Sequence, residues 1–388
     1  MKPMRVLHIV GSMDRGGVES RTMDIYRNID RNSVQFDFLV RSNKKGHFDD
    51  EIISLGGKII FVRRKLPNLL EGLLNSTKAM SGYKIVHMHS SNAYDAVLNC
   101  FCALLAGAKI RIIHSRSNSD VQRVMLHKIL KLLIPLFANY YFSISQVSGE
   151  WMFSKGLLNE NRYIKVYDAI DSKKYIYNTE TRIKLRKQLG LEGKFVIGHV
   201  GRFNIVKNHN YLIKVFEKIA RNIPESVLML VGDGELREKI ESQITELNIA
   251  DKAVLLGVRD DVPDLMQAMD VLVFPSVFEG FGDAVLEAQA AGLKAIVSDK
   301  ITKETEIVKG LVDFLPIDNS VDTWVDTIIN CYNYKTERQN THEKIVEAGF
   351  DIKASTQWYE AFYLSLGKRQ SARPKKMAVK RYYDIFKL

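Results

Sequence analysis

The stretch PSVFEGFGDAVLEAQAAG, residues 275–292, carries the strongest signal in this chain. It begins at the end of an apolar run, VLVFPS at 271–276, and continues into helix-like sequence. Glu279 and Glu287 enclose glycines at 280 and 282, which let a backbone turn sharply and approach a ligand. A purely structural junction needs at most one glycine, so the stretch indicates a binding site between a strand and a helix.

Apolar strands alternate with amphipathic helical stretches along the whole chain. Two successive runs of strand–helix units predict an α/β protein with two doubly wound parallel sheets. Ligands then bind at the carboxyl ends of the strands, and a crevice between the domains is the natural site. The predicted strands are 6–11, 36–40, 58–62, 85–89, 111–114 and 140–145, followed by 195–201, 227–232, 253–257, 271–276 and 294–299.

The helix after the glycine turn is expected to begin near Gly282. Its free N–H groups and the positive end of its dipole suit a phosphate. Glu287 lies one turn into that helix, and Glu279 precedes the turn. A carboxylate accepts two hydroxyl hydrogens at once, which suits a diol such as ribose or a pyranose. The stretch therefore indicates a nucleotide-sugar site; a surface helix with ordinary glutamates is the alternative, because glycine turns are common.

Two further stretches supply candidate ligands for a diphosphate. In VGRFNIVKNHN, Arg202 and Lys207 follow a strand and can clamp a diphosphate as it leaves, unless they are solvated surface cations. In VGSMDRGGVES, Gly16 and Gly17 precede a helix, and their amides can meet phosphate oxygens. The glycine spacing here is not the G-x-G-x-x-G dinucleotide fingerprint.

In order and spacing, these stretches resemble the retaining nucleotide-sugar glycosyltransferases of family 4, which have the GT-B fold. EGFGDAVLE at 279–287 matches the E-x7-E signature of that family. The resemblance covers most of the chain and is closest to bacterial enzymes of capsular and exopolysaccharide assembly. The other matching segments are 16–17, 201–207, 230–238, 255–276 and 290–299.

The resemblance implies a role for each matching residue. Arg202 and Lys207 bind the diphosphate, and Gly17 contacts it from the N-terminal domain. Glu279 touches the donor sugar, and Glu287 holds the ribose hydroxyls. All four charged residues are intact, which argues against an inactive relative.

Further contacts to the donor are implied through the backbone. The base is held at Val258 and Arg259, and sugar or phosphate is met by the amides of Phe281, Gly282, Asp283 and Ala284. The implied reaction keeps the anomeric configuration and uses no metal and no cofactor beyond the nucleotide-sugar donor, which we expect to be UDP-linked.

A histidine expected by the family pattern is displaced. The family commonly has one at the end of the strand within RIIHSRSNSD, 111–120. His114 is present there, but Arg116 occupies the place that often carries the histidine. We favour His114 for the catalytic role on the acceptor side; a satisfied structural histidine is the alternative.

Two other departures concern the interdomain turn and the glycine-rich turn. The family's V-P-N-G-I-D reads VYDAID at 166–171, which places Asp168 and Ala169 where asparagine and glycine are usual. Asp283 stands where an apolar residue is usual. An acid is unfavourable beside a diphosphate but favoured at a helix N-terminus, so we expect Asp283 to contact a hydroxyl or amide of the donor sugar.

The resemblance also assigns the domains. The chain of 388 residues is too long for one ordinary domain. We expect an acceptor-binding Rossmann-like domain over 1–172 and a nucleotide-sugar-binding one over 173–350. The polar sequence after residue 172 predicts a linker and a short helix. In 351–388 we expect a helix that packs back toward the N-terminal domain, followed by a basic tail.

The net charge of +11 calls for an anionic partner. Residues 368–388 hold eight basic residues and one acid, interleaved with aromatic residues, which is typical of an anchor at an anionic membrane surface. The apolar stretch 125–142, with Lys128 and Lys131, either faces the acceptor and the membrane or is a core helix. A nucleic-acid partner is disfavoured, because the basic residues lie in a tail without base-stacking platforms.

Three cysteines cannot form a disulfide framework, which fits a reducing cytosol. These features predict a cytoplasmic enzyme, peripheral at the inner face of the cell membrane, that transfers a sugar to a lipid-linked saccharide acceptor. A UDP-sugar 2-epimerase-like enzyme and a non-catalytic membrane scaffold of the same fold are the alternatives.

Overall fold

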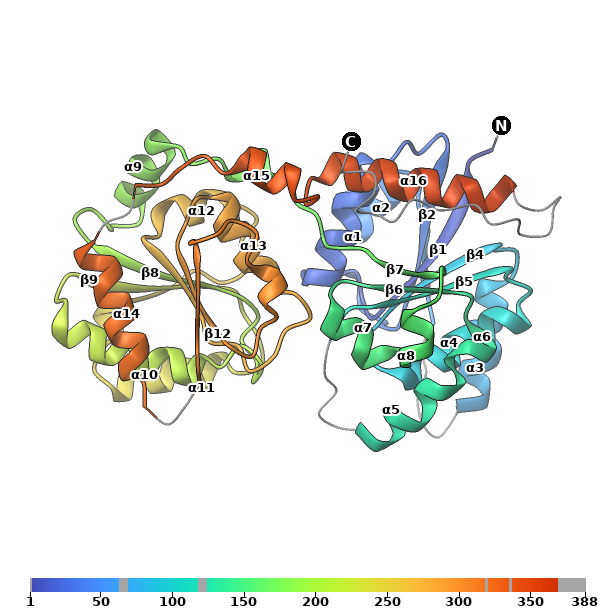
Figure 1. The fold of residues 1–388 in the computed structure, drawn as a ribbon, viewed down its shortest axis with the longest axis horizontal. Coiled ribbons are helices and arrows are strands. Elements are labelled where there is room, and N and C mark those ends of the chain that lie inside the picture. The colour runs from blue at the N-terminus through green and yellow to red at the C-terminus, as the bar shows by residue number, and fades with distance from the viewer. Residues whose placement is uncertain (1, 63–68, 118–123, 318–319, 335–336, 369–388) are drawn as a thin grey trace. The chain divides into compact units, whose positions relative to one another are not determined.

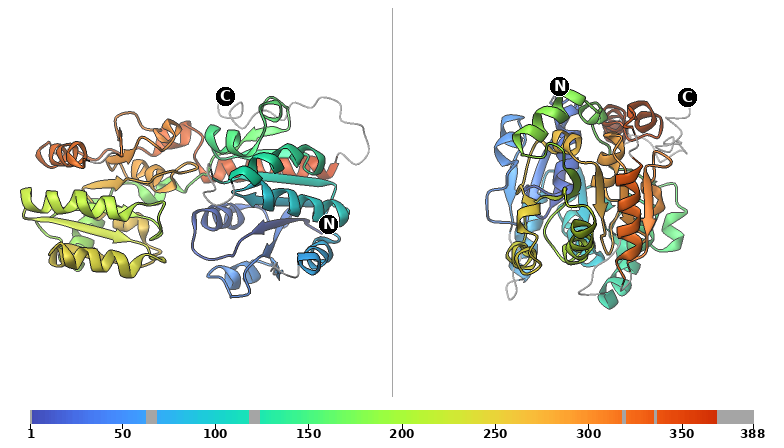
Figure 2. Two further views of the ribbon diagram at one scale, coloured as in Figure 1. Left: turned by 90° about the horizontal axis from the view of Figure 1, so that it is seen from below. Right: turned by 90° about the vertical axis from the view of Figure 1, so that its left-hand side faces the viewer.

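The computed structural model describes residues 2–62, 69–117, 124–317, 320–334 and 337–368. It divides into two compact units, Met1–Ile170 with Gly349–Leu388, and Asp171–Ala348. Each unit is a parallel sheet with helices on both faces, as Figure 1 and the turned views of Figure 2 show. The predicted fold class, two doubly wound parallel α/β sheets, is confirmed.

The first unit contains a seven-stranded sheet in the order β3-β2-β1-β4-β5-β6-β7. Strand β1 pairs with β2 on one side and β4 on the other, so the direction of winding reverses between β1 and β4, where doubly wound sheets bind ligands. The strands are β1 (Met4–Val10), β2 (Val34–Val40), β3 (Ile59–Phe61), β4 (Ile85–Ser90), β5 (Ile110–Ser115), β6 (Tyr140–Ser143) and β7 (Tyr163–Lys165). Strand β7 was not predicted.

Helices cover both faces of the first sheet. One face packs against α1 (Gly17–Asn28), α2 (Asp49–Ser54) and the last helix, α16 (Ile352–Lys368). The core of this face includes Trp358 and Phe362 of α16, so this helix belongs to the first unit. The opposite face packs against elements that include α3 (Leu69–Met80), α4 (Ala93–Leu105), α7 (Gln146–Met152) and α8 (Lys155–Leu158).

The second unit contains a six-stranded sheet in the order β10-β9-β8-β11-β12-β13. Its winding reverses between β8 and β11. The strands are β8 (Phe195–Val200), β9 (Ser226–Val231), β10 (Ala253–Leu255), β11 (Val271–Phe274), β12 (Ala295–Ser298) and β13 (Val312–Leu315). Strand β13, whose four residues are VDFL, was not predicted.

The helices of the second unit also form two layers. The buried side of α10 has Leu212, Val215, Phe216 and Ile219 at helical spacing, and each fully buried side chain of this kind contributes about 1.5–3 kcal/mol. Helices α10 (His209–Asn222), α11 (Arg237–Glu246) and α14 (Asp322–Asn333) share this core. The remaining helices are α9 (Thr179–Gln188), α12 (Val262–Ala268), α13 (Asp283–Ala290) and α15 (His342–Glu347).

The polar segment after residue 172 contains a short helix, α9, and is part of the second unit. Arg182 and Arg186 of α9 bind both carboxylate oxygens of Asp270, which directly precedes β11. Arg182 also donates to the carbonyl of Met269 at 2.8 Å. These bonds attach α9 to the sheet. Its charged sequence gave no indication of this packing role.

The apolar stretch 125–142 does not form a core helix. It divides into α5 (Val124–Leu130), the 3-10 turn Lys131–Leu133 and α6 (Ile134–Phe137) before β6 begins. Met125, Leu132 and Leu136 are 78%, 65% and 67% exposed, whereas His127 and Ile134 are buried. Among the described residues, no helix has both the length and the apolar character that crossing a bilayer requires. Residues 369–388, which hold most of the predicted basic tail, lie outside the described part.

Candidate active site

Two loops at the carboxyl edge of the second sheet bring a cation and a carboxylate together. The Nζ atom of Lys207, in the loop after β8, lies 2.5 Å from Oε1 of Glu279, in the loop after β11. Their side chains are only 18% and 16% exposed. Lys207 Nζ also lies 4.4 Å from the centroid of the Phe274 ring. The ammonium is therefore fixed at the point where the winding reverses, where a ligand is expected.

Hydrogen bonds between the two loops set this geometry. The backbone N–H of Val277 donates to the carbonyl of Val206 at 2.9 Å. Asn208 adopts a left-handed conformation, with φ of 54°, and its amide donates to the carbonyl of Pro275 at 3.2 Å. Asn204 accepts from the backbone N–H of Lys207 at 3.1 Å. Lys207 thus extends from a loop that is tied on both sides, which limits the entropy lost when it binds an anion.

The loop after β9 packs closely against the loop after β8, with backbone atoms in contact. Gly232, after β9, has φ of 139°, and a Cβ atom there would overlap the carbonyl oxygen of Gly201. The N–H of Phe203 donates to the carbonyl of Asp233 at 2.9 Å. The VGDGEL sequence is too short to be a nucleotide fingerprint, and sequence reasoning missed its actual role: its glycines let the loop that carries Arg202 sit against the sheet.

Gly232→Ala tests this close approach. We expect it to lower the free energy of unfolding by at least about 2 kcal/mol, because both the backbone conformation and the space exclude a side chain. Gly190→Ala is the matched control, since Gly190 also has a positive φ, 67°, but an added Cβ would meet nothing within 4 Å. It should cost only about 1 kcal/mol. Urea unfolding measures both, and equal losses would contradict the prediction.

The glycine-rich turn caps a helix that starts at the same edge. Gly282 has φ of 94° and is the N-cap of α13, whose first residue is Asp283. The first turn of a helix presents backbone N–H groups and a partial positive charge. Glu287 is 7% exposed and lies one turn further along. Phe281 and Ala284 are buried, so only their backbone amides are suited to meeting a ligand.

Three other predicted residues follow strands of the same sheet. Arg202, after β8, is 71% exposed and lies 3.3 Å from a carboxylate oxygen of Glu235 rather than beside Glu279. Val258 and Arg259 follow β10. Val258 is exposed, and the Arg259 guanidinium forms a two-pronged pair with Asp261 at 2.7 and 2.5 Å. The loops after β8, β10 and β11 therefore supply every candidate site residue of the second unit outside α13 itself.

Two predicted residues belong to the first unit. Gly17 is exposed and begins α1, directly after the N-cap Gly16. His114 is 1% exposed in β5, and its Nδ1 lies 3.3 Å from Nε2 of His87. Desolvation by burial holds the pKa of His114 well below its ordinary value, so the ring is neutral. His114 thus lies in a buried cluster, and its acceptor-side role stays a prediction.

The two departures from the family pattern in the first unit contact each other. Arg116 follows β5 and Asp168 follows β7, and the guanidinium and carboxylate bind at 2.7 and 2.8 Å. Their side chains are 6% and 7% exposed. This is a buried, two-pronged ion pair, the strong geometry for arginine and carboxylate. The two residues that depart from the family pattern, Arg116 and Asp168, therefore form an ion pair with each other.

Two buried histidines lie behind Lys207 and were not predicted. His199 of β8 binds the carbonyl of Val273 through Nδ1 at 2.9 Å, and its ring centroid is 4.7 Å from that of His209. Neither ring nitrogen of His209 has a hydrogen-bond partner among the described residues. Burial lowers the pKa of His209 to about 4 and that of His199 well below its ordinary value. Both rings are neutral at pH 7.

His209 should therefore make the stability depend on pH. The unfolded chain binds the proton with a pKa near 6.5, so stability is complete above that pH and is lost as the pH falls toward 4. Lowering the pH from 7 to 5 should therefore reduce the free energy of unfolding by about 2 kcal/mol through His209. His209→Leu leaves no partner unpaired and should remove that part of the loss. Urea unfolding at both pH values measures it, and an unchanged pH dependence in the variant would contradict the assignment.

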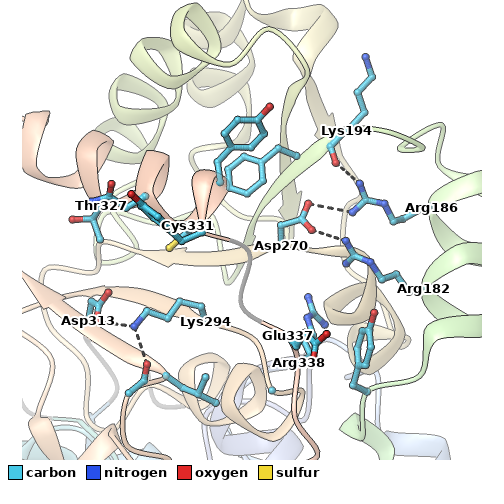
Figure 3. Close-up of a pocket in the computed structure, with 18 of the residues that line it drawn as sticks. Arg182, Arg186, Lys194, Asp270, Lys294, Asp313, Thr327, Cys331, Glu337 and Arg338 are labelled. Atoms are coloured by element: carbon cyan, nitrogen blue, oxygen red, sulfur yellow. Dashed lines mark hydrogen bonds and ion pairs between the residues drawn. The ribbon is translucent and has the colours of Figure 1, made fainter.

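A cavity of about 820 Å³ lies elsewhere in the second unit, and Figure 3 shows its lining. It opens near the amino ends of the strands, since Phe195 begins β8 and Lys294 precedes β12. Three of its cations form ion pairs within the unit: Lys294 pairs with Asp313 at 2.8 Å, and Arg182 and Arg186 bind Asp270. The charges here stabilise the unit, and the candidate site is at the opposite edge of the sheet.

Comparisons with known proteins show the family of this chain. Residues 181–349 match the family described as "Glycosyl transferases group 1". EpsF of Bacillus subtilis (strain 168), named as a glycosyltransferase, is 30% identical over 359 residues, which cover 89% of this chain and 93% of EpsF. The chain belongs to the group 1 glycosyltransferases. The capsular polysaccharide biosynthesis glycosyltransferase CapH of Staphylococcus aureus is 24% identical over 93% of this chain and 99% of its own.

Solved structures show that this glycosyltransferase has the GT-B fold. HepE of Anabaena, in complex with UDP-glucose, superposes with a TM-score of 0.75 at 20% identity, covering 94% of this chain and 100% of that one. The glycosyltransferase WaaG superposes with a TM-score of 0.68 at 14% identity, covering 92% and 99%. The family was predicted as the capsular and exopolysaccharide type of GT-B glycosyltransferase, and that prediction is confirmed.

Proposed function

We propose that this protein is a retaining, metal-independent glycosyltransferase that moves a hexose from a UDP-linked donor to a lipid-linked oligosaccharide. The observation that carries the proposal is the Lys207–Glu279 pair at the point where the second sheet reverses its winding. A relative from Escherichia coli, 30% identical over 70% of this chain and 72% of its own, is named as a UDP-Gal-dependent galactosyltransferase acting on a diphosphoundecaprenol-linked sugar.

The donor is held by groups of the second unit. Lys207 has three donors, so it can keep Glu279 and still bind a phosphate oxygen. The first turn of α13 binds the same diphosphate through its amides. Arg202 exchanges Glu235 for the diphosphate, which costs little because an exposed ion pair contributes at most about 1 kcal/mol. Glu287 accepts the ribose hydroxyls.

The remaining contacts decide which donor is used. Backbone at Val258 and Arg259 holds the base, and Glu279 binds the donor sugar beside Lys207. Asp283 at the start of α13 reads a hydroxyl or amide of that sugar. A site built to hydrogen-bond a substrate hydroxyl rejects an analogue that lacks it by large factors, because its polar groups are then left unpaired.

The transfer proceeds on one face of the sugar. The bond from the anomeric carbon to the phosphate oxygen breaks, and the acceptor oxygen forms its bond on the same side. The departing phosphate oxygen takes the proton of the acceptor hydroxyl. Charge grows on the diphosphate during this step, and fixed cations stabilise it there, as a metal ion does in other transferases. Gly17 assists from the first unit, and His114 acts on the acceptor side.

We also propose that the enzyme is cytoplasmic and binds the inner face of the cell membrane. The support is the group of exposed apolar side chains on α5, the 3-10 turn and α6, with Lys128 among them. These elements pack against α4, which adds exposed Leu104 and Leu105. Basic residues of the tail would add attraction to anionic lipid.

Vesicle flotation tests this surface. The protein should float with anionic phospholipid vesicles, and Met125→Ser/Leu132→Ser/Leu136→Ser should weaken binding by at least about tenfold, because each apolar side chain contributes free energy when it enters the interface. Ile53→Ser/Ile183→Ser is the control, since these exposed side chains lie on α2 and α9. Equal binding by both variants would contradict this surface.

Incubation with UDP-sugars and a lipid-linked saccharide tests the reaction itself. We expect donor consumption that requires the acceptor, and NMR of the product should show the donor's anomeric configuration retained. Conversion of free UDP-sugar without any acceptor would instead indicate the epimerase. Failure to bind UDP in calorimetry would indicate the non-catalytic scaffold.

A further inference from the structure

We propose that the first unit binds one divalent transition-metal ion, of the zinc, nickel and cobalt class, through His8, His87 and His89. This site is separate from the donor groups of the second unit and takes no part in the proposed transfer. Each of the three residues offers one nitrogen, and these nitrogens all lie within 4.8 Å of one another. Imidazole is a preferred ligand for this class of ion.

The sheet itself assembles the three rings. His8 of β1 stands opposite His87 of β4 in the parallel register, and His89 follows two residues later on the same face. These strands flank the point where the first sheet reverses its winding. Nδ1 of His8 lies 3.0 Å from Nε2 of His89, a separation compatible with two nitrogens that each sit about 2.0–2.1 Å from one ion.

The rings of His8 and His87 are buried. A neutral imidazole keeps the lone pair that an ion needs. Nδ1 of His8 and Nε2 of His89 face each other, and these are the nitrogens that would hold the ion.

A neighbouring group orients the third ring. Nδ1 of His87 binds the hydroxyl of Tyr363, on α16, at 2.7 Å, and Nε2, on the other side of the ring, lies 3.3 Å from Nδ1 of His114. Metal-binding histidines generally have their second nitrogen held in this way. The three histidines line a small cavity of about 20 Å³, which is room for a single ion or water. Arg116 also lines it, and its charge is compensated by Asp168.

Cobalt titration of the full chain, freed of metal by a chelator, tests the site. We expect one equivalent of Co²⁺ with visible d–d bands, displaced by one equivalent of Zn²⁺. His8→Gln and His89→Gln should each weaken Co²⁺ binding by at least about tenfold. His47→Gln, at an exposed histidine on the same unit, is the matched control and should bind as the wild type does.

Tyr363→Phe keeps the packing and removes only the hydroxyl that orients His87, so it should weaken binding by about tenfold. If the wild type binds no Co²⁺ at micromolar concentration, the histidines are only hydrogen-bonded to one another and the proposal is overturned. Unchanged binding in His8→Gln and His89→Gln, with wild-type far-UV circular dichroism, would overturn it equally.

Discussion

Lys207→Ala is expected to lower kcat/KM for sugar transfer by about 10²–10³, the usual effect of removing one fixed group that stabilises charge in the transition state. Lys207 is held by Glu279, by the Phe274 ring and by a tied loop, so its ammonium has a fixed position. The donor loses part of its affinity, but charge grows on the diphosphate only during transfer. The fall should therefore appear mainly in kcat.

Lys214→Ala is the matched control for this prediction. Lys214 lies on α10, directly after the same loop, and its side chain is exposed. It should leave kcat/KM within about twofold, because surface substitutions are usually neutral. Lys207→Arg restores the charge without the compact ammonium and should recover only part of the rate. Equal activities for Lys207→Ala and Lys214→Ala, in folded protein, would show that Lys207 does not serve the reaction.

Arg116→Ala should destabilise the first unit by about 3–5 kcal/mol, because it leaves the carboxylate of Asp168 buried without its counter-charge. Asp168→Ala should cost a similar amount for the converse reason. Replacing both residues with apolar ones, Arg116→Met/Asp168→Leu, removes both charges together and should recover most of the loss. A double-mutant cycle from urea unfolding measures the coupling.

Lys45→Ala is the control for the ion pair. Lys45 and Asp50 lie 2.7 Å apart in the same unit but are 66% and 75% exposed, so the loss should be under about 1 kcal/mol. If Arg116→Ala costs no more than Lys45→Ala, the buried pair does not compensate for the two departures from the family pattern.

The parts of the structure that follow from local sequence could be predicted. The long apolar strands predict the two sheets, and the E-x7-E stretch predicts the turn at Gly282. Both could be recognised because each pattern lies within a few neighbouring residues. Lys207 and Glu279 were both expected in the site, and the structure brings them into contact. Short strands such as β7 were not predicted, because three residues are too few to show a periodic pattern.

What sequence could not supply depends on contacts between distant residues. The Arg116–Asp168 pair joins the ends of two strands, and neither residue reveals the other in the sequence. The imidazoles of His8 and His89 meet only because the β1–β4 register places them on one face. The close packing at Gly232 could not be predicted either, because the atom that excludes a side chain there is the carbonyl oxygen of Gly201, in the loop after β8.

A crystal structure with bound UDP-sugar tests the central claim most directly. The diphosphate is expected within hydrogen-bond distance of Lys207 Nζ and of the first-turn amides of α13, with the ribose hydroxyls on Glu287. Density for the nucleotide in the cavity at the amino ends of the strands, beside Lys294 and Arg186, would contradict the proposed site. So would a diphosphate that touches neither Lys207 nor α13.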